Sequence, residues 1–321
     1  GRASDRLGCS VVTKKVAIAY AIALMLIAIS PTTWTLALAL FVFGAAHGAM
    51  DVAMNAWAAE VERAGERPLM SSFHAMFSVG AGIGAASGSA AAAIELNFPI
   101  HFVLAAVIFT TITLSFTTIP WSSTKMLTEN HSESLFVFPR GALFVVGLVA
   151  FCASLGEGAM ADWSAIFLVS VASVSDAEAA LGYVVFSITM VTMRLIGDRI
   201  VAWLGPVTAA RVGGSVAAVG SLIAVFLATF PMILLGFALM GIGYAVVMPL
   251  AFTRAANDKN IPQGAAIASV STLGYGGILL GPPLIGFVAE VTSLQVAFLI
   301  MSVLACVIAL LAGILRVEAN E

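Results

Sequence analysis

Charged residues are scarce in this sequence. Of its 321 residues, 10% are charged and 61% are hydrophobic, whereas a soluble domain has about 25% charged residues and roughly half apolar ones. The sequence also lacks the period-2 alternation that is typical of an outer-membrane barrel. These absences favour an all-α membrane protein, whose helices need ~20 apolar residues for each span.

Cysteine is also scarce, and the motifs of common cofactor-binding enzymes are missing. Three cysteines, Cys9, Cys152 and Cys306, lie far apart without metal-ligand spacing. The sequence has no phosphate-binding loop, zinc-binding helix or nucleophile elbow, and no strand precedes the glycines of 80–84, as a dinucleotide site would require. We therefore expect no enzyme activity, cofactor, metal or nucleic-acid partner. The expected partners are the lipid bilayer, a small-molecule solute and protons, and the expected state is a monomer.

Charged or turn-forming clusters divide the chain into ten apolar segments. We predict that each segment is a membrane-spanning helix, at about 16–30, 33–59, 69–94, 99–119, 140–169, 178–196, 208–229, 232–254, 264–288 and 293–315. The longest polar segment then joins a group of four helices to a group of six. The predicted domains are an N-terminal bundle at 1–120, a linker at 121–139 and a C-terminal bundle at 140–321.

Positive charge is absent from every loop on one side of this ten-helix topology. All 14 Lys and Arg residues fall in loops on the other side, and the side without them carries Glu95, Asp176, Glu178 and Glu290. Positive residues are retained on the cytoplasmic face. We therefore expect a protein of the plasma membrane, a bacterial inner membrane, with both ends of the chain and the linker in the cytoplasm.

The segment 33–59 carries polar residues in its apolar interior. His47, Asp51 and Asn55 follow one another at steps of four, which places them on one face of a helix. Asp51 lies roughly 13 Å inside the cytoplasmic end of this helix, at ~1.5 Å per residue. An acid at that depth is costly unless it faces a polar cavity or a partner. These three residues are therefore candidates for a substrate or proton pathway, with a structural hydrogen bond as the alternative.

Further candidates lie on two other segments. Glu157 is roughly 25 Å along its helix from Arg140, and Asp162 follows on the same helix. Tyr244 offers a hydroxyl that could bind a substrate. The alternatives are outer water for Asp162 and packing for Tyr244. By contrast, a cluster near the end of 33–59 reads as a solvated cytoplasmic turn: Glu60, Glu62, Arg63, Glu66 and Arg67.

Small residues and a repeat complete the pattern. Gly80, Gly84 and Gly88 recur at steps of four, which predicts a groove where another helix can pack closely.

An internal repeat at an offset of 194 aligns Pro68 with Pro262 and Gly80 with Gly274. Two parallel halves are typical of secondary transporters. In halves of six helices, the segment 33–59 would be the fourth helix, so we expect the chain to start after two helices of the pattern.

The first eight residues resemble a loop of the major facilitator superfamily. Gly1-Arg2-Ala3-Ser4-Asp5-Arg6-Leu7-Gly8 is similar to the G-x-x-x-D-[RK]-x-G loop between the second and third helices of that family, although its usual basic pair is replaced by Cys9-Ser10. A second copy, 194–199, falls between helices eight and nine. The resemblance implies a cytoplasmic latch in which Asp5 and Asp198 interact with helix N-termini, whose dipoles favour negative charge. The implied latch residues are Gly1, Asp5, Arg6, Gly8, Arg194, Gly197, Asp198 and Arg199.

A further motif bears on the branch of the family. Gly277, Gly281 and Pro282, which we expect to pack closely against another helix, resemble the G-x-x-x-G-P motif of drug/proton antiporters. The motif sits in the predicted eleventh helix, whereas those antiporters carry it in the fifth, where this chain has Gly88-Ser89. This departure counts against a drug antiporter.

The resemblance implies a fold and a function. The fold is that of the major facilitator superfamily without the first two of its twelve helices, with ten present. The function is alternating-access transport of a small polar solute, coupled to protons, and closest to small-sugar permeases. The alternatives are a drug or metabolite exporter of the same superfamily, a non-transporting membrane sensor and an inactive fragment.

The topology can be tested by labelling. Single cysteines at Asn97 and at Ser132, in a version without the native cysteines, are expected to react with an impermeant maleimide from opposite faces of the membrane. The reason is the one-sided distribution of Lys and Arg. Reaction of both cysteines from outside would contradict the ten-helix topology.

Overall fold

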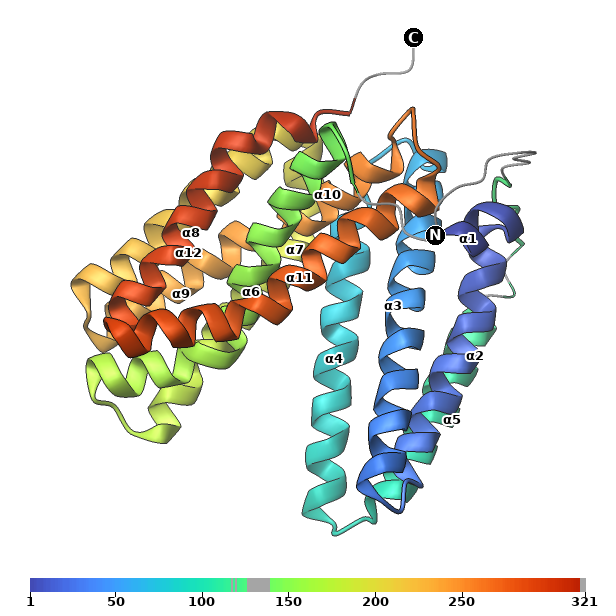
Figure 1. Cartoon of the computed structure of the whole chain (residues 1–321), viewed down its shortest axis with the longest axis horizontal. Coiled ribbons are helices and arrows are strands. Elements are labelled where there is room, and N and C mark those ends of the chain that lie inside the picture. Colours follow the sequence, from blue (N-terminus) through green and yellow to red (C-terminus); the bar gives the residue numbers. More distant parts are fainter. Residues whose placement is uncertain (117, 119, 126–138, 318–321) are drawn as a thin grey trace.

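Helices make up all the regular secondary structure that this computed structural model describes, which covers residues 1–116, 118, 120–125 and 139–317. The helices form two bundles. The bundles meet at the end where the first residues of the chain lie, and they diverge toward the opposite end (Figure 1). The prediction of an all-α fold is therefore confirmed.

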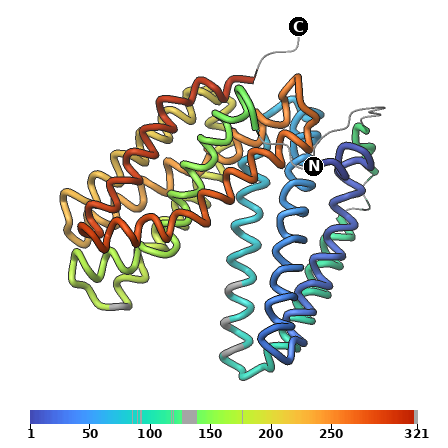
Figure 2. Tube along the Cα trace, in the orientation of Figure 1, coloured from blue at the N-terminus to red at the C-terminus, as the bar shows by residue number. Residues whose placement is uncertain are grey.

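The N-terminal bundle contains a short helix and four long ones. It is coloured blue to teal in the trace of Figure 2. Its helices are α1 (Arg2–Leu7), α2 (Cys9–Ala28), α3 (Thr33–Ala64), α4 (Met70–Ala93) and α5 (Phe98–Phe116).

The C-terminal bundle is coloured green to red in the same trace. Its elements are α6 (Ala142–Ala172), α7 (Asp176–Leu204), α8 (Pro206–Leu227), α9 (Phe230–Tyr244), α10 (Val247–Ala256), α11 (Gln263–Val291), α12 (Leu294–Leu311) and the 3-10 helix η1 (Ala312–Leu315).

Nine helices within the described ranges are long and apolar enough to cross a membrane, with α9 and α10 counted together as one span. The remaining predicted span corresponds to α4, a helix of 24 residues that lies outside this set of nine. Most of the predicted linker, 126–138, falls outside the described residues.

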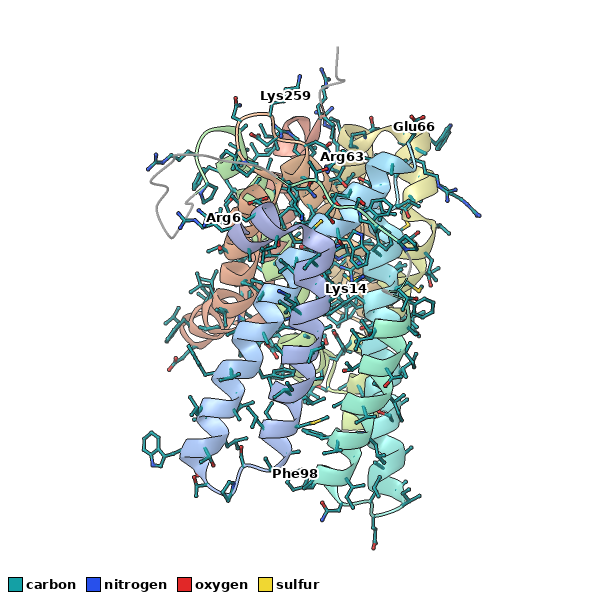
Figure 3. The ribbon with its side chains drawn as sticks, turned by 90° about the vertical axis from the view of Figure 1, so that its right-hand side faces the viewer. Arg6, Lys14, Arg63, Glu66, Phe98 and Lys259 are labelled. Carbon is teal, nitrogen blue, oxygen red and sulfur yellow. The ribbon has the colours of Figure 1, made fainter. Side chains whose placement is uncertain are left out.

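Charged side chains gather at the end where the bundles meet. Figure 3 shows Arg6, Arg63, Glu66 and Lys259 there, with Phe98 at the opposite end of the molecule. This one-sided arrangement matches the charge pattern of the loops. Which of the two ends faces the cytoplasm stays a prediction.

The segment predicted as one helix at 232–254 is in fact broken. α9 ends at Tyr244 and α10 begins at Val247. Pro249 explains the break, because a proline has no N–H to donate to the carbonyl four residues earlier and its ring crowds that carbonyl. The carbonyl concerned belongs to Ala245, which is therefore free to accept a hydrogen bond from another helix.

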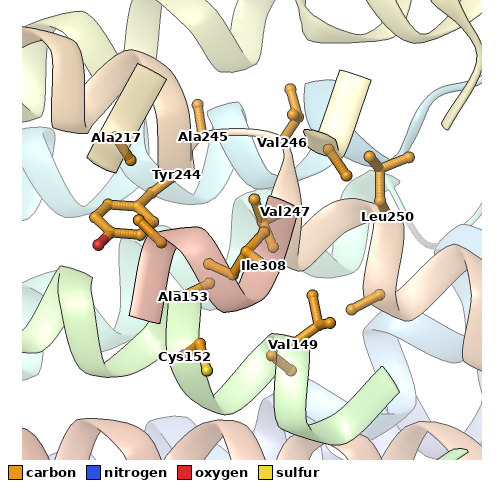
Figure 4. Packing of buried hydrophobic residues seen from close by; sticks show 14 of the residues in the cluster. Val149, Cys152, Ala153, Ala217, Tyr244, Ala245, Val246, Val247, Leu250 and Ile308 are labelled. Atoms are coloured by element: carbon orange, nitrogen blue, oxygen red, sulfur yellow. The ribbon is translucent and has the colours of Figure 1, made fainter. Parts of the chain in front are cut away.

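The densest packing lies in the C-terminal bundle. Phe167, Phe237 and Phe298 are fully buried, and the rings of Phe167 and Phe298 lie 4.1 Å apart between centroids. Gly220 of α8 packs directly on Gly236 of α9, since a Cβ on Gly220 would lie only 2.5 Å from the Gly236 carbonyl oxygen. Figure 4 shows part of this core, with buried side chains that come from α6, α8, α9, α10 and α12.

The two predicted packing motifs differ in outcome. A Cβ on Gly277 would overlap the Phe151 carbonyl of α6, and one on Gly281 would lie 3.2 Å from the Leu155 carbonyl, so this part of α11 packs closely on α6. In contrast, no atom lies within 4 Å of a Cβ built on Gly80 or Gly84. The prediction of a tightly packed groove on α4 was therefore wrong at these two positions, because they border open space.

This contrast generates a stability test. Gly277→Ala is expected to destabilise the protein by about 1–3 kcal/mol, the usual cost of overpacking, because the added methyl group meets the backbone of α6. Gly80→Ala is the matched control and is expected to be neutral or slightly stabilising, because alanine favours helix. Thermal unfolding in detergent measures both, and equal losses would contradict the packing described here.

Candidate functional site

A polar cavity of about 170 Å³ lies between the two bundles. Helices α3 and α4 line it from one bundle, and α6, α7, α10 and α11 line it from the other. Its polar lining residues are His47, Asp51, His74, Ser154, Glu157, Arg194, Ser271 and Tyr275. A second cavity of about 630 Å³, within the N-terminal bundle, shares His47 and Asp51 with it and is also lined by the open glycine face of α4.

Asp51 joins α3 to α11 across this cavity. Asn55 donates from Nδ2 to Asp51 Oδ1 at 3.0 Å, and Ser271 of α11 donates from Oγ to Oδ2 at 3.2 Å. Tyr275, one turn further along α11, lines the same cavity. Asp51 and Asn55 are thus brought together as the helical spacing predicts, but Ser271 is a partner and Tyr275 a cavity neighbour that the sequence did not indicate.

His47 lies one turn away on the same face of α3. Its Nδ1 is 3.2 Å from the Tyr20 hydroxyl of α2, and its ring meets the edge of Tyr275 at 6.4 Å between centroids. Polar groups of α2, α3 and α11 therefore lie near one another where the two cavities share His47 and Asp51.

Glu157 forms an ion pair with Arg194 inside the protein. Arg194 Nη2 donates to Glu157 Oε1 at 3.0 Å and to Oε2 at 3.2 Å. The Arg194 side chain is 8% exposed and that of Glu157 is 25% exposed. Burial of either charge alone would be costly, and the pair relieves that cost.

Arg194 also bonds two neutral groups. Its Nε donates to the Ala245 carbonyl at 3.2 Å, which is the carbonyl freed by Pro249. Its Nη1 donates to Ser78 Oγ of α4 at 3.1 Å, so the guanidinium reaches across to the N-terminal bundle.

Two loop assignments need correction. The segment 194–199 was predicted to be a cytoplasmic loop, but it is helical within α7, and Arg194 lies inside the protein. The physical reason is that Glu157 supplies a counter-charge at this depth, so the arginine can be buried. Most of the first eight residues, likewise predicted as a loop, form helix α1.

Two other candidates lie away from the cavity. Tyr244 is fully buried in the C-terminal core, and its hydroxyl donates to the Met301 carbonyl at 3.4 Å. The prediction that Tyr244 binds substrate was therefore wrong, because its ring fills the space beside Gly156 inside the bundle. Asp162 is exposed, outside the set of residues that lines the central cavity.

At the end where the bundles meet, two aspartates make reciprocal contacts. Asp198 of α7 accepts from the backbone N–H groups of Ser71 and Ser72, each at 2.9 Å, at the start of α4. Asp5 of α1 accepts from the Gly264 N–H at 2.8 Å, at the start of α11. Each carboxylate thus satisfies the unpaired N–H groups of a helix in the opposite bundle and lies at the positive end of its dipole.

The other implied latch residues surround these contacts. Gly197 lets α7 approach α4, because a Cβ there would lie 3.0 Å from Ser71. Gly1 packs on Gly264, and Gly8 adopts a positive φ of 92° between α1 and α2. Arg6 and Arg199 are exposed.

The cluster that was expected to be a solvated turn is only partly solvated. Arg63, Glu66 and Arg67 are exposed, but Glu60 and Glu62 are buried, at 8% and 9% exposed. Glu60 accepts from the Trp121 indole at 2.8 Å, and Glu62 accepts from the Thr253 hydroxyl of α10 at 2.8 Å. Each acid finds donors on a distant segment, which a sequence pattern within α3 does not reveal.

Two helix bundles around a polar cavity, with a broken helix at the cavity wall, are the architecture of a secondary transporter. Comparison with known proteins agrees. The sequence profile of the Major Facilitator Superfamily matches residues 1–260. The chain is 45% identical to a transporter, y4wD, of Sinorhizobium fredii over 98% of its own length and 84% of that protein. It is 43% identical to an MFS-type transporter of Yersinia pestis over 81% of its length and 67% of that protein.

Solved structures show the same fold. The fucose transporter FucP, in its outward conformation, superposes with a TM-score of 0.76 at 16% identity, over 96% of this chain and 83% of FucP. The human organic anion transporter MFSD10 gives 0.77 at 18% identity, over 98% of this chain and 79% of that protein. This chain belongs to the Major Facilitator Superfamily and is a multi-pass membrane transporter.

The reciprocal contacts predict a stability change. Asp198→Ala is expected to destabilise the protein by about 1 kcal/mol, within the ~0.5–2 kcal/mol usual for a lost helix cap, since the first N–H groups of α4 lose their acceptor. Arg199→Ala, at the exposed neighbouring position, is the control and is expected to change little. Thermal unfolding measures both, and an unchanged Asp198→Ala variant would show that water replaces the carboxylate.

Proposed function

We propose that this protein is a secondary active transporter that moves a small polar solute through the central cavity by alternating access. One observation carries the proposal: the cavity lies between the bundles, and each of its charged groups is tied to both. Asp51 on α3 is bonded to α11, and the Glu157–Arg194 pair of the C-terminal bundle is bonded to α4. A solute bound there would contact both moving parts.

The balance of charges around the cavity supports the proposal of proton coupling. Among the described residues that line it, Arg194 is committed to Glu157, and Asp51 is bonded to neutral donors and lies near His47. A carboxylate in a membrane interior without a fixed positive partner is costly when it is charged. Asp51 is therefore the proposed proton acceptor, and His47 on the next turn is the proposed relay.

The size and chemistry of the cavity favour a small solute rich in hydroxyl groups. Its volume of about 170 Å³ admits a sugar-sized molecule. Its carboxylates, serine hydroxyls and Tyr275 offer both donors and acceptors. FucP is a fucose:proton symporter, and its likeness to this chain is one of fold. A drug or metabolite exporter, or a sensor that does not transport, is the alternative.

The arrangement of the bundles supports an assignment of state. The bundles touch at the end rich in Lys and Arg and diverge at the other (Figure 1). With the positive end in the cytoplasm, this is the outward-facing state, and the contacts of Asp5 and Asp198 act as the cytoplasmic latch.

Transport in proteoliposomes tests the proposal. The protein, expressed from its complete reading frame, is given an inward proton gradient and a panel of radiolabelled sugars, polyols and organic acids. We expect one of the hydroxyl-rich solutes to accumulate, and we expect Asp51→Asn to lower its proton-driven uptake at least tenfold. Asp162→Asn removes an exposed acid and serves as the control.

Each contrary outcome is informative. Uptake by Asp51→Asn that still depends on the gradient would overturn the role of Asp51 as proton acceptor. Proton-driven release of a lipophilic compound, without uptake of any sugar or polyol, would favour the exporter. Binding without flux across the whole panel would favour the sensor.

A further inference from the structure

The Ser154 hydroxyl on α6 meets a weak hydrogen-bond acceptor at the wall of the central cavity. Its Oγ donates to the Met248 sulfur of α10 at 3.4 Å, and both residues line the cavity. A thioether sulfur accepts hydrogen bonds only weakly. The Ser271 hydroxyl of the same cavity, by comparison, donates to the Asp51 carboxylate. An oxygen atom of a solute would therefore be a stronger acceptor for Ser154 than the sulfur that holds its hydroxyl now.

The Met248 side chain shields this hydroxyl from the cavity. Ser154 is only 3% exposed, although it belongs to the cavity wall. A methionine side chain is unbranched and has three rotatable bonds, so it adapts its shape readily. Gly274 of α11 borders the same place, since a Cβ built on it would lie 3.4 Å from both the Met248 methyl group and the Ser154 Oγ. The methionine thus fills a space that a group of the solute can enter when the side chain turns aside.

We propose that Ser154, Met248 and Gly274 form a subsite for one oxygen-bearing group of the solute, and that Met248 fills this subsite while the cavity is empty. When the solute binds, Met248 turns away, and a hydroxyl or carbonyl oxygen of the solute accepts a hydrogen bond from Ser154. Ser154 then determines which oxygen is recognised, and Met248 sets the limit on size. This inference rests on the transport function proposed above and specifies the solute for the same cavity.

The position of the subsite favours a solute that carries oxygen at opposite ends. Ser154 lies three residues before Glu157, so the two side chains share one face of α6. Asp51 lies on the wall formed by the other bundle, and the cavity between them has a volume of about 170 Å³. A molecule of this size that contacts both walls needs a polar group for each. A hexose or a hexitol meets this requirement, whereas an apolar compound with a single polar group does not.

Equilibrium binding tests the recognition of an oxygen. The protein, expressed from its complete reading frame and placed in nanodiscs, is given radiolabelled hexoses, hexitols and their monodeoxy derivatives. Ser154→Ala is expected to weaken binding of the preferred solute about fivefold, the usual effect of one lost neutral hydrogen bond. The monodeoxy derivative that lacks the recognised oxygen should bind the parent more weakly and should be insensitive to Ser154→Ala. Ser170→Ala removes a hydroxyl that bonds carbonyls of α6 itself, and this matched control should bind as the parent does.

A second set of solutes tests the limit on size. Met248→Ala is expected to raise the affinity for N-acetylated hexosamines, relative to that for the preferred hexose or hexitol, about tenfold, as expected when a pocket gains room for a small apolar group. Met248→Leu conserves the volume of the side chain, so it should not relax the limit on size. Relaxation by both variants alike would show that the volume of Met248 is not what restricts the solute.

Chemical labelling tests the shielding by Met248 without any solute. Ser154→Cys, in protein without the native cysteines, is treated with a methanethiosulfonate reagent in nanodiscs. Met248→Ala should raise its labelling rate roughly fivefold, because the reactivity of a thiol follows its exposure. The preferred solute should slow this reaction. Ile278→Cys, at a position that is 44% exposed in the same cavity, shows that the reagent reaches the cavity and should label at the same rate with and without Met248→Ala.

The contrary outcomes separate the subsite from the transport function. If a solute binds the parent and Ser154→Ala equally well, the subsite is overturned while the proposed transport function stands. An equal loss of affinity for every deoxy derivative in Ser154→Ala would indicate a structural role and would also count against the subsite. Equal labelling of Ser154→Cys with and without Met248→Ala would overturn the shielding. If no solute of the panel binds the parent, the proposed function fails and the subsite with it.

Discussion

A buried guanidinium needs hydrogen-bond acceptors in several directions. The packing of the helices around the central cavity depends on placing such acceptors around Arg194. Glu157 supplies the counter-charge, Ser78 supplies a hydroxyl from the other bundle, and the break at Pro249 supplies a backbone carbonyl. Each acceptor comes from a different helix, so the packing of the helices and the burial of the charge require each other. The polar groups of the cavity are in this sense also the groups that hold the bundles together.

The closed end of the molecule follows a related rule. The N-terminus of a helix exposes unpaired N–H groups, and those of α4 and α11 are satisfied by aspartates of the opposite bundle. These hydrogen bonds are directional and few, and they are made between preformed helices. An interface of this kind can open without unfolding either bundle, as the proposed alternating access requires. The buried Glu62, bonded to Thr253, adds a similar tie between α3 and α10.

The sequence alone was sufficient for the class of fold and for part of the site. Hydrophobic segment length and the one-sided Lys and Arg predicted the helices, since a bilayer imposes both constraints locally along the chain. The four-residue spacing of Asp51 and Asn55 correctly placed them on one face. Local pattern was insufficient where a residue's environment comes from distant segments. Tyr244, Glu60 and Glu62 were misplaced for this reason, as were Gly80 and Gly84.

Hydropathy and charge asymmetry by themselves determined that this protein is a helical membrane protein, because both act locally through the bilayer. The resemblance of the two aspartate motifs to the superfamily implied the two bundles and the transporter function. The tertiary structure alone decided that Arg194 lies inside the protein and that its partners are Glu157, Ser78 and Ala245. It also decided that Ser271 donates to Asp51 and that Tyr275 lines the same cavity. The physical reason is that the cost of burying a charge depends on which groups surround it in space, and those groups are up to 220 residues away along the chain.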